Sequence, residues 1–186
     1  MYNSDSSEKL VIGFDSANPG FLTNARWRMV GVEATEEGDK RLQEELLKPY
    51  SNGKRITFRR KRRDADEILR EQVEIVRNHA LNIYQRLFTT NERTKPIYKS
   101  EIQAILECLE MAQIYERSYS SVYVDQIPGV EKVNGYFVKK VKKLTGVEPV
   151  IEPHLDCKIG VVKAAHWIGD FGRYKDLQKR KFEKTF

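Results

Sequence analysis

VEPVIEPHLDCKIGVVKAAHWIGDFGR, residues 147–173, is the stretch from which the fold of this chain is read. Apolar Val150 and Ile151 lie between two prolines, a pattern that predicts a short strand over Glu148–Pro153. Past Asp156 the apolar residues recur every third position, as one face of a helix requires. They are Ile159, Val162, Ala165 and Ile168. The stretch therefore predicts a strand, a turn and a helix that begins at Asp156.

Asp156 has two interpretations at that position. A carboxylate at a helix N-terminus accepts hydrogen bonds from free backbone N–H groups and is stabilised by the helix dipole, so a capping role alone explains the residue. The second interpretation is a role in a ligand site, and it depends on what the rest of the chain brings to the same place.

Two other stretches favour the ligand site. Leu10–Asp15 (LVIGFD) and Ser121–Asp125 (SVYVD) are apolar strands that end in an aspartate. In α/β sheets, ligand sites form at the carboxyl edge of the strands, so Asp15 and Asp125 can meet Asp156 there. Hard divalent cations prefer oxygen ligands, and such a cluster therefore suggests Mg²⁺ or Mn²⁺.

At this point the chain resembles the ribonuclease H superfamily, and most of all the type 2 ribonucleases H. The last motif of that family is an aspartate followed by a lysine, a Val-Val pair, an Ala-Ala pair and an arginine. Here these are Asp156, Lys158, Val161-Val162, Ala164-Ala165 and Arg173. GFDSANPG resembles the opening strand and loop with Asp15, and SVYVDQ resembles the strand that carries the central aspartate, Asp125. The resemblance covers the first strands and residues 120–173.

Three positions depart from the type 2 pattern. Ser16 stands where the family has a glutamate after the first aspartate. Asn18-Pro19-Gly20 replaces the glycine-arginine-glycine loop, and His166 replaces the serine that follows the Ala-Ala pair. The fourth carboxylate is therefore absent from its expected place.

Glu101 is the candidate that replaces this carboxylate. It lies in the first turn of an expected helix that runs directly into SVYVD, an order that resembles the type 1 ribonucleases H, in which such a helix carries the catalytic glutamate. Glu33 and Glu107 are weaker candidates. A first-turn acid that interacts with the helix dipole is the other explanation of Glu101.

Composition and charge limit the classes of function that are open to this chain. The chain has 186 residues, a net charge of +6 and a pI of about 9.2, which fits a single domain and favours anionic partners. Two cysteines, Cys108 and Cys157, suit a reducing compartment. The polar start, Met1–Lys9, and the lack of a long apolar run predict a cytoplasmic protein without a signal peptide or membrane contact.

Lys54–Arg63 (KRITFRRKRR) is basic and contains no acidic residue. We expect it to neutralise phosphates, although charged residues on an edge strand also discourage aggregation. The predicted nucleic-acid-binding residues are Lys54, Arg55, Arg59, Arg60, Lys61, Arg62, Arg63, Lys158 and Arg173. The basic tail, 173–186, is expected to be a helix that crosses phosphates or a frayed end.

The expected fold is α/β and ribonuclease H-like, one domain over residues 1–186, with a mixed five-stranded sheet and helices on both faces. Three antiparallel strands come from the N-terminal half, with Lys54–Arg63 as an edge strand, and Ser121–Asp125 and Glu148–Pro153 follow as parallel strands. Asp64–Thr90 is predicted to be one long helix because Ile68, Val76, Ile83 and Leu87 form an apolar stripe.

The resemblance implies a metal-dependent nuclease. Asp15, Glu101, Asp125 and Asp156 would be the catalytic residues and the ligands of two divalent ions, Mg²⁺ or Mn²⁺. The implied substrate is an RNA–DNA hybrid or structured nucleic acid. Two alternatives stay open: a catalytically degraded module that binds nucleic acid or a protein partner, and a nuclease that resolves DNA junctions. The oligomeric state is not determined by these patterns.

Overall fold

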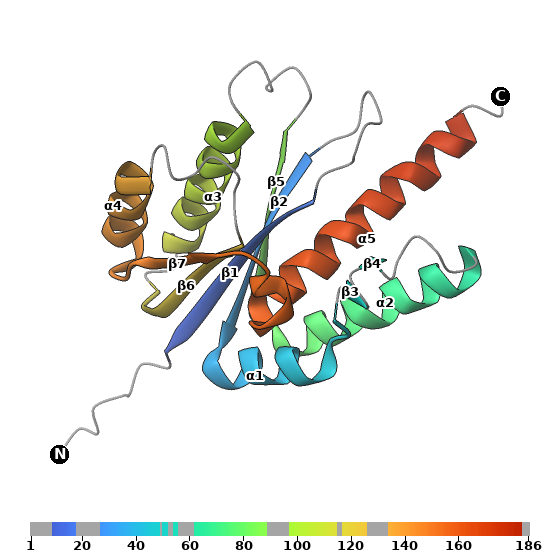
Figure 1. The fold of residues 1–186 in the computed structure, drawn as a ribbon, viewed down its shortest axis with the longest axis horizontal. Coiled ribbons are helices and arrows are strands. Elements are labelled where there is room, and N and C mark those ends of the chain that lie inside the picture. Colours follow the sequence, from blue (N-terminus) through green and yellow to red (C-terminus); the bar gives the residue numbers. More distant parts are fainter. Residues whose placement is uncertain are drawn as a thin grey trace.

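Five strands form one mixed sheet with the order β5-β2-β1-β6-β7 (Figure 1). They are β1 (Leu10–Ala17), β2 (Trp27–Thr35), β5 (Asn82–Phe88), β6 (Tyr119–Asp125) and β7 (Pro149–Glu152). β2 is antiparallel to both β1 and β5, and β6 is parallel to both β1 and β7. The mixed five-stranded sheet expected from the sequence is confirmed. The computed structural model describes residues 9–17, 27–48, 50–51, 54–55, 62–88, 97–114, 117–125 and 134–183.

Helices cover both faces of this sheet. They are α1 (Glu36–Glu45), α2 (Arg62–His79), α3 (Ile97–Gln113), α4 (Asn134–Thr145) and α5 (Gly160–Glu183), with a 3₁₀ turn, η4 (Leu155–Cys157). α3 and α4 lie on one face, and α1, α2 and α5 lie on the other (Figure 1). Within the described ranges, none of the helices is both long enough and apolar enough to cross a membrane.

Successive side chains of β1 point to opposite faces of the sheet. Phe14 belongs to the core under α3 and α4, whereas Val11 belongs to the core under α1, α2 and α5. Side chains alternate along a strand, so Asp15 is directed to the α5 face. α5 packs very closely on β1, because a β-carbon at Gly13 would lie 2.7 Å from the backbone nitrogen of Val162. Gly13 thus allows α5 to lie directly beside Asp15.

The predicted helix over Asp64–Thr90 is wrong in its second half. α2 ends at His79, and β5 then forms the edge of the sheet beside β2. Ile83 and Leu87 are four residues apart, a spacing that suits a helix, but Ile83 and Tyr84 pack on opposite faces of the sheet, as strand residues do. The spacing of Ile83 and Leu87 fits both a helix and a strand, and the pairing of this segment with β2 makes it a strand.

The predicted edge strand in Lys54–Arg63 is also wrong, because β5 occupies that edge. Lys54–Arg55 forms a two-residue strand, β4, that pairs with β3 (Tyr50–Ser51) in a separate small sheet. Most of the remaining basic stretch lies outside the described residues, and helix α2 begins at Arg62.

The last helix begins later than the sequence pattern predicted. α5 starts at Gly160, and Asp156 lies in the preceding turn η4. Asp39 of α1 supplies the N-terminal carboxylate instead, because its Oδ1 accepts a 2.7 Å hydrogen bond from the backbone N–H of Val161. A β-carbon at Gly160 would collide with the carbonyl oxygen of Asp39, so glycine is needed for this approach. The capping interpretation of Asp156 is therefore wrong. The expected basic tail is helical as far as Glu183.

Candidate active site

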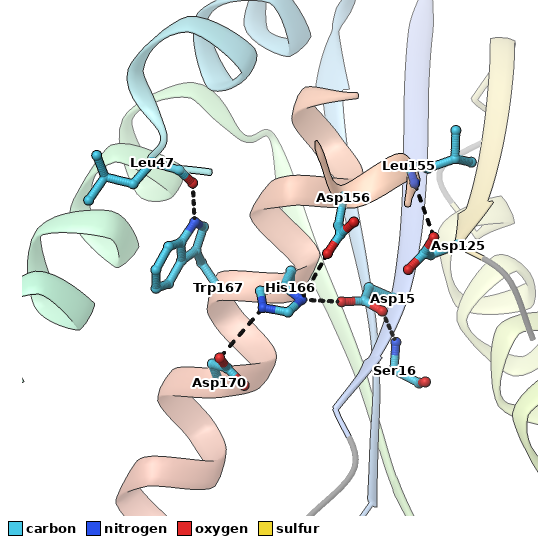
Figure 2. A network of polar contacts seen from close by, with 9 residues as sticks. All are labelled: Asp15, Ser16, Leu47, Asp125, Leu155, Asp156, His166, Trp167 and Asp170. Atoms are coloured by element: carbon cyan, nitrogen blue, oxygen red, sulfur yellow. Dashed lines mark hydrogen bonds and ion pairs between the residues drawn. The ribbon is translucent and has the colours of Figure 1, made fainter. Parts of the chain in front are cut away.

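Asp15 and Asp125 lie next to each other at the carboxyl edge of the sheet. The parallel register pairs Phe14 of β1 with Val124 of β6, so each aspartate is the next residue of its strand. Val124 belongs to the core under α3 and α4, and alternation therefore turns Asp125, like Asp15, toward α5. Figure 2 shows both aspartates beside the turn that precedes α5.

Asp125 also holds the turn that carries Asp156. Its Oδ1 accepts a 3.1 Å hydrogen bond from the backbone N–H of Leu155. His154 reaches this turn in the left-handed conformation, with φ of 61°, which a non-glycine residue adopts uncommonly. Asp156 is thereby brought into the site as a buried residue, 2 % exposed.

His166 on α5 contacts two of the three aspartates (Figure 2). Its Nδ1 lies 2.8 Å from Oδ2 of Asp15 and 3.5 Å from Oδ2 of Asp156. Its Nε2 lies 3.5 Å from Oδ2 of Asp170, one helical turn further along α5. Burial alone disfavours the charged ring, but the hydrogen bonds and charges of Asp15 and Asp170 outweigh burial and raise the pKa of His166 to about 10. The aspartates on both sides of the ring therefore favour its protonated form.

Glu101 approaches the same edge from the opposite face. It lies on α3, is 2 % exposed, and its side chain accepts a hydrogen bond from the hydroxyl of Ser16, the residue after Asp15. Burial raises the pKa of Glu101 to about 7; the Ser16 hydrogen bond opposes this rise, and the charge of Asp15 adds to it. Ser16, which replaces the glutamate of the type 2 pattern, is thus the residue that Glu101 contacts.

The two weaker carboxylate candidates lie elsewhere. Glu33 lies on β2, where it pairs with Ile12 of β1, away from the carboxyl end of β1. It is fully buried and accepts four side-chain hydrogen bonds. The donors are Asn82, Tyr84, Arg117 and Tyr119, at 2.8 to 3.1 Å. Glu107 pairs with Arg86 at 2.7 Å. Both carboxylates already have structural partners, so neither is available to complete the site.

The predicted nucleic-acid-binding residues are only partly described. Lys158 is exposed beside η4, and Arg173 lies on α5. Lys54 and Arg55 form β4, and Arg62 and Arg63 begin α2. Arg59, Arg60 and Lys61 lie outside the described residues. Their contact with phosphates stays a prediction.

Sequence reasoning missed His166 and Asp170 as members of the site. One signal was present: His166 stands where the resembled family has a serine, and a carboxylate follows four residues later, which is one turn on the same helix face. The pairing of His166 with Asp15 spans 151 residues and has no local signature.

Carboxylate oxygens are the ligands that a hard divalent cation prefers, although two of the predicted ligands, Asp15 and Asp156, contact His166. In the part of the chain that the structure describes, no three His, Cys, Asp or Glu side chains are already arranged as a metal shell. Oε2 of Glu101 and Oδ1 of Asp156 are nevertheless buried and have no hydrogen-bond partner among these residues. Burial also raises the pKa of Asp156, against the opposing charge of His166. Buried acceptor oxygens without a donor are groups that a cation would satisfy.

Replacing Glu101 with glutamine is expected to remove a pH dependence of stability. The carboxyl keeps its proton up to about pH 7 in the folded chain, whereas its ordinary pKa is 4.5. Between these values the folded state binds more protons than the unfolded state, so the free energy of unfolding falls as pH rises, by at most about 3 kcal/mol. Urea denaturation in the presence of a chelator measures this fall.

The matched control for this prediction is Glu110→Gln, a change at an exposed position on the same helix. It should keep the pH dependence of the unmodified protein. Equal pH dependence in Glu101→Gln and the unmodified protein would contradict the raised pKa of Glu101.

Two solved structures resemble this fold over nearly the whole chain. The complex of PCNA and RNase HII from Archaeoglobus fulgidus matches with a TM-score of 0.68 and 19 % identity, over 94 % of this chain and 77 % of that one. Ribonuclease H2 from Pyrococcus horikoshii OT3 matches with a TM-score of 0.71 and 18 % identity, over the same shares. No protein-family model and no curated protein sequence matches.

The fold is therefore ribonuclease H-like. More narrowly, it is similar to the fold of archaeal ribonucleases HII, as the sequence motifs indicated. At this level of identity the likeness concerns the fold, and the activity is a separate question.

Proposed function

We propose that this protein is a divalent-metal-dependent nuclease that hydrolyses phosphodiester bonds in RNA–DNA hybrids or structured nucleic acid. The observation that supports the proposal is that Asp15 and Asp125 end neighbouring strands at the carboxyl edge of a ribonuclease H-like sheet. Buried Glu101 and Asp156 both interact with the charge of Asp15, and each has one buried oxygen without a hydrogen-bond partner among the described residues. Buried carboxylate oxygens without a hydrogen-bond donor lower stability, and a bound cation would satisfy them.

The position of each carboxylate suggests its role in binding the metal. Asp15 and Asp125 stand side by side and would share the metal, while Glu101 and Asp156 would complete its ligands from the two faces of the sheet. When bound, Mg²⁺ or Mn²⁺ supplies Lewis-acid stabilisation of the charge that develops on the phosphate. Glu101 and Asp156 have raised pKa values, and they lose their protons more readily when a cation is beside them.

Substrate contact would come from the basic residues near this edge and along α5. Lys158 is exposed next to Asp156, and Arg173 lies on α5, the helix that carries His166. Lysine and arginine neutralise phosphates without reading sequence. Discrimination for RNA would come from the A-form shape of a hybrid and its 2′-OH groups.

A substrate panel tests the proposal. The purified protein is incubated with Mn²⁺ or Mg²⁺ and with an RNA–DNA hybrid, duplex DNA, single-stranded RNA or a four-way DNA junction. We expect cleavage of the hybrid that stops on addition of a chelator and is lost in Asp125→Ala. Cleavage of the junction alone would support the junction-resolving alternative, and metal-dependent cleavage that survives in Asp125→Ala would refute the assigned site.

A degraded module is the second candidate, and one observation favours it. His166 contacts Asp15 and Asp156 at the place where a metal would be expected between them. If the module only binds, gel-shift assays will show nucleic acid bound without cleavage, and calorimetry will detect no Mg²⁺ or Mn²⁺ binding. Metal binding at the aspartates separates the two candidates.

A further inference from the structure

Helix α4 has one side packed in the core and one side that is positively charged. Its sequence, NGYFVKKVKKLT, contains lysines but no acidic residue. Phe137 and Val141 are fully buried and belong to the core under α3 and α4. The lysines lie on the other side of the helix and are all exposed; they are Lys139, Lys140, Lys142 and Lys143.

We propose that the exposed side of α4 binds the phosphate backbone of a nucleic acid outside the active site. The residues of this α4 surface are Tyr136, Lys139, Lys140 and Lys143, whose spacing of three and four positions puts them on one side of the helix. The described basic residues that were predicted from the sequence lie elsewhere, on β4, α2 and α5 and beside η4. The inference rests on the proposed function in taking nucleic acid as the ligand, and it adds a second contact region.

The lysines of the α4 surface have no acidic partner within the described part of the chain. α4 does form an ion pair there, between Lys142 and Glu148 at 2.8 Å, but Lys142 is not part of this surface. On α1 and α2, by contrast, exposed basic residues pair with an acid one turn away: Lys40 with Glu37, Arg70 with Asp66 and Arg77 with Glu74. The counter-charge of the α4 surface therefore comes from the solution or from a ligand.

The spacing of these lysines also lowers the stability of α4. Lys143 lies four positions after Lys139 and three after Lys140, so like charges repel across one turn of the helix. The helix dipole favours cations in the last turn, which explains Lys142 and Lys143 but not the two earlier lysines. A row of phosphates supplies the opposite charge and relieves this repulsion.

Tyr136 adds an aromatic ring beside the lysines. It is 58 % exposed, and Nζ of Lys140 lies 5.7 Å from the centre of its ring. Aromatic rings next to basic residues are typical of surfaces that bind nucleic-acid strands, because a base packs on the ring while the cations contact the phosphates. A membrane fits less well, since an amphipathic helix binds lipid through its apolar side, and that side of α4 is already packed in the core.

The N-terminal end of α4 lies toward the edge of the sheet that carries the active site. β6 ends at Asp125 on this edge, and α4 connects β6 to its parallel neighbour β7. A helix that joins two parallel strands runs back along the sheet, from the end of the first strand to the start of the second. α4 and α5 lie on opposite faces (Figure 1). A nucleic acid that spans the carboxyl edge thus contacts α5 on one side and α4 on the other.

The salt dependence of binding tests the inference. Binding to a fluorescent RNA–DNA hybrid is measured by anisotropy in the presence of a chelator, so that no metal-dependent cleavage takes place. The association constant falls with salt concentration, and on logarithmic scales each neutralised phosphate of a duplex adds about 0.9 to the slope. We expect the variant Lys139→Gln/Lys140→Gln/Lys143→Gln to bind more weakly, with a slope that is smaller by about two to three.

The matched control removes the same charge from α1 and α2. It is Lys40→Gln/Arg70→Gln/Arg77→Gln, and it should keep the slope of the unmodified protein. An unchanged slope in the α4 variant overturns the inference. An equal loss in the control also overturns it, because net charge would then explain the effect, and so does a failure of the unmodified protein to bind the hybrid.

Two further measurements keep these outcomes distinct. Thermal unfolding shows whether the α4 variant is folded; if it is not, Lys139→Gln alone is measured and should lower the slope by about one. Vesicles that contain phosphatidylserine are tested in parallel, and an α4 variant that loses vesicle binding but keeps hybrid binding would contradict the inference. If the α4 variant lowers the slope but the unmodified protein cleaves no nucleic acid with Mn²⁺, the nuclease proposal fails and this inference stands.

Discussion

Asp15→Asn is expected to slow metal-dependent cleavage by about a thousandfold or more. Asp15 contacts His166, its charge acts on Glu101 and Asp156, and it stands beside Asp125, so it is linked to the three other predicted ligands of the metal. Metal ions contribute several kcal/mol to stabilising the transition state, and about 4 kcal/mol corresponds to a thousandfold in rate. Asparagine keeps the size of the side chain, and its oxygen can still accept the hydrogen bond that Ser16 N–H donates to Asp15.

The measurement is single-turnover cleavage of an RNA–DNA hybrid with saturating Mn²⁺. Asp66→Asn is the matched control, because Asp66, whose side chain is 30 % exposed, pairs with Arg70 on α2 and should leave the rate unchanged. Thermal unfolding of both variants shows that each is folded. Cleavage by Asp15→Asn within tenfold of the unmodified rate would show that Asp15 does not hold the metal.

Glu33→Ala is expected to lower the free energy of unfolding by about 3–5 kcal/mol, the cost of breaking a buried ion pair. Arg117 lies 3.0 Å from Oε1 of Glu33, and the hydroxyls of Tyr84 and Tyr119 also donate to this carboxylate. Removing it takes one acceptor away from each of two buried hydroxyls and from a mostly buried guanidinium. Urea denaturation measures the change.

Glu107→Ala is the control for Glu33→Ala. Glu107 also pairs with an arginine, Arg86, but its side chain is 33 % exposed, so the expected loss is about 0–1 kcal/mol. The fraction of Glu33→Ala that folds should cleave at the unmodified rate, since Glu33 lies away from the site. If both variants lose the same free energy of unfolding, burial does not explain the contribution of the Glu33 hydrogen bonds to stability.

The carboxylate of Glu33 and those of Glu101 and Asp156 differ in how many of their oxygens have hydrogen-bond donors, and this difference separates a structural role from a functional one. Glu33 is buried with a full set of donors, as expected of a group that stabilises the fold. Glu101 and Asp156 are equally buried, yet each leaves one oxygen without a donor among the described residues. Buried charge that the fold does not satisfy lowers stability, and such sites are where ligands bind.

The ends of the strands could be predicted from sequence because their signals are local. LVIGFD and SVYVD are apolar runs that end in an aspartate, and the parallel pairing of β1 with β6 then places Asp15 beside Asp125. Strand β7 was predicted for the same reason, whereas β5 was predicted as part of a helix. Ile83 and Leu87 show the limit of this reasoning, since their spacing suits both a helix and a strand, and only pairing with β2 decided between them.

The sequence by itself determined which residue types stand at the carboxyl edge of the sheet, since each strand and its terminal aspartate are encoded within a few neighbouring positions. The tertiary structure alone decided what those aspartates contact. Asp39 caps α5 from 122 residues away, His166 reaches Asp15 across 151, and Glu101 meets Ser16 from the other face of the sheet. These contacts depend on how helices pack on the sheet, and packing joins positions whose separation in the chain leaves no periodic pattern.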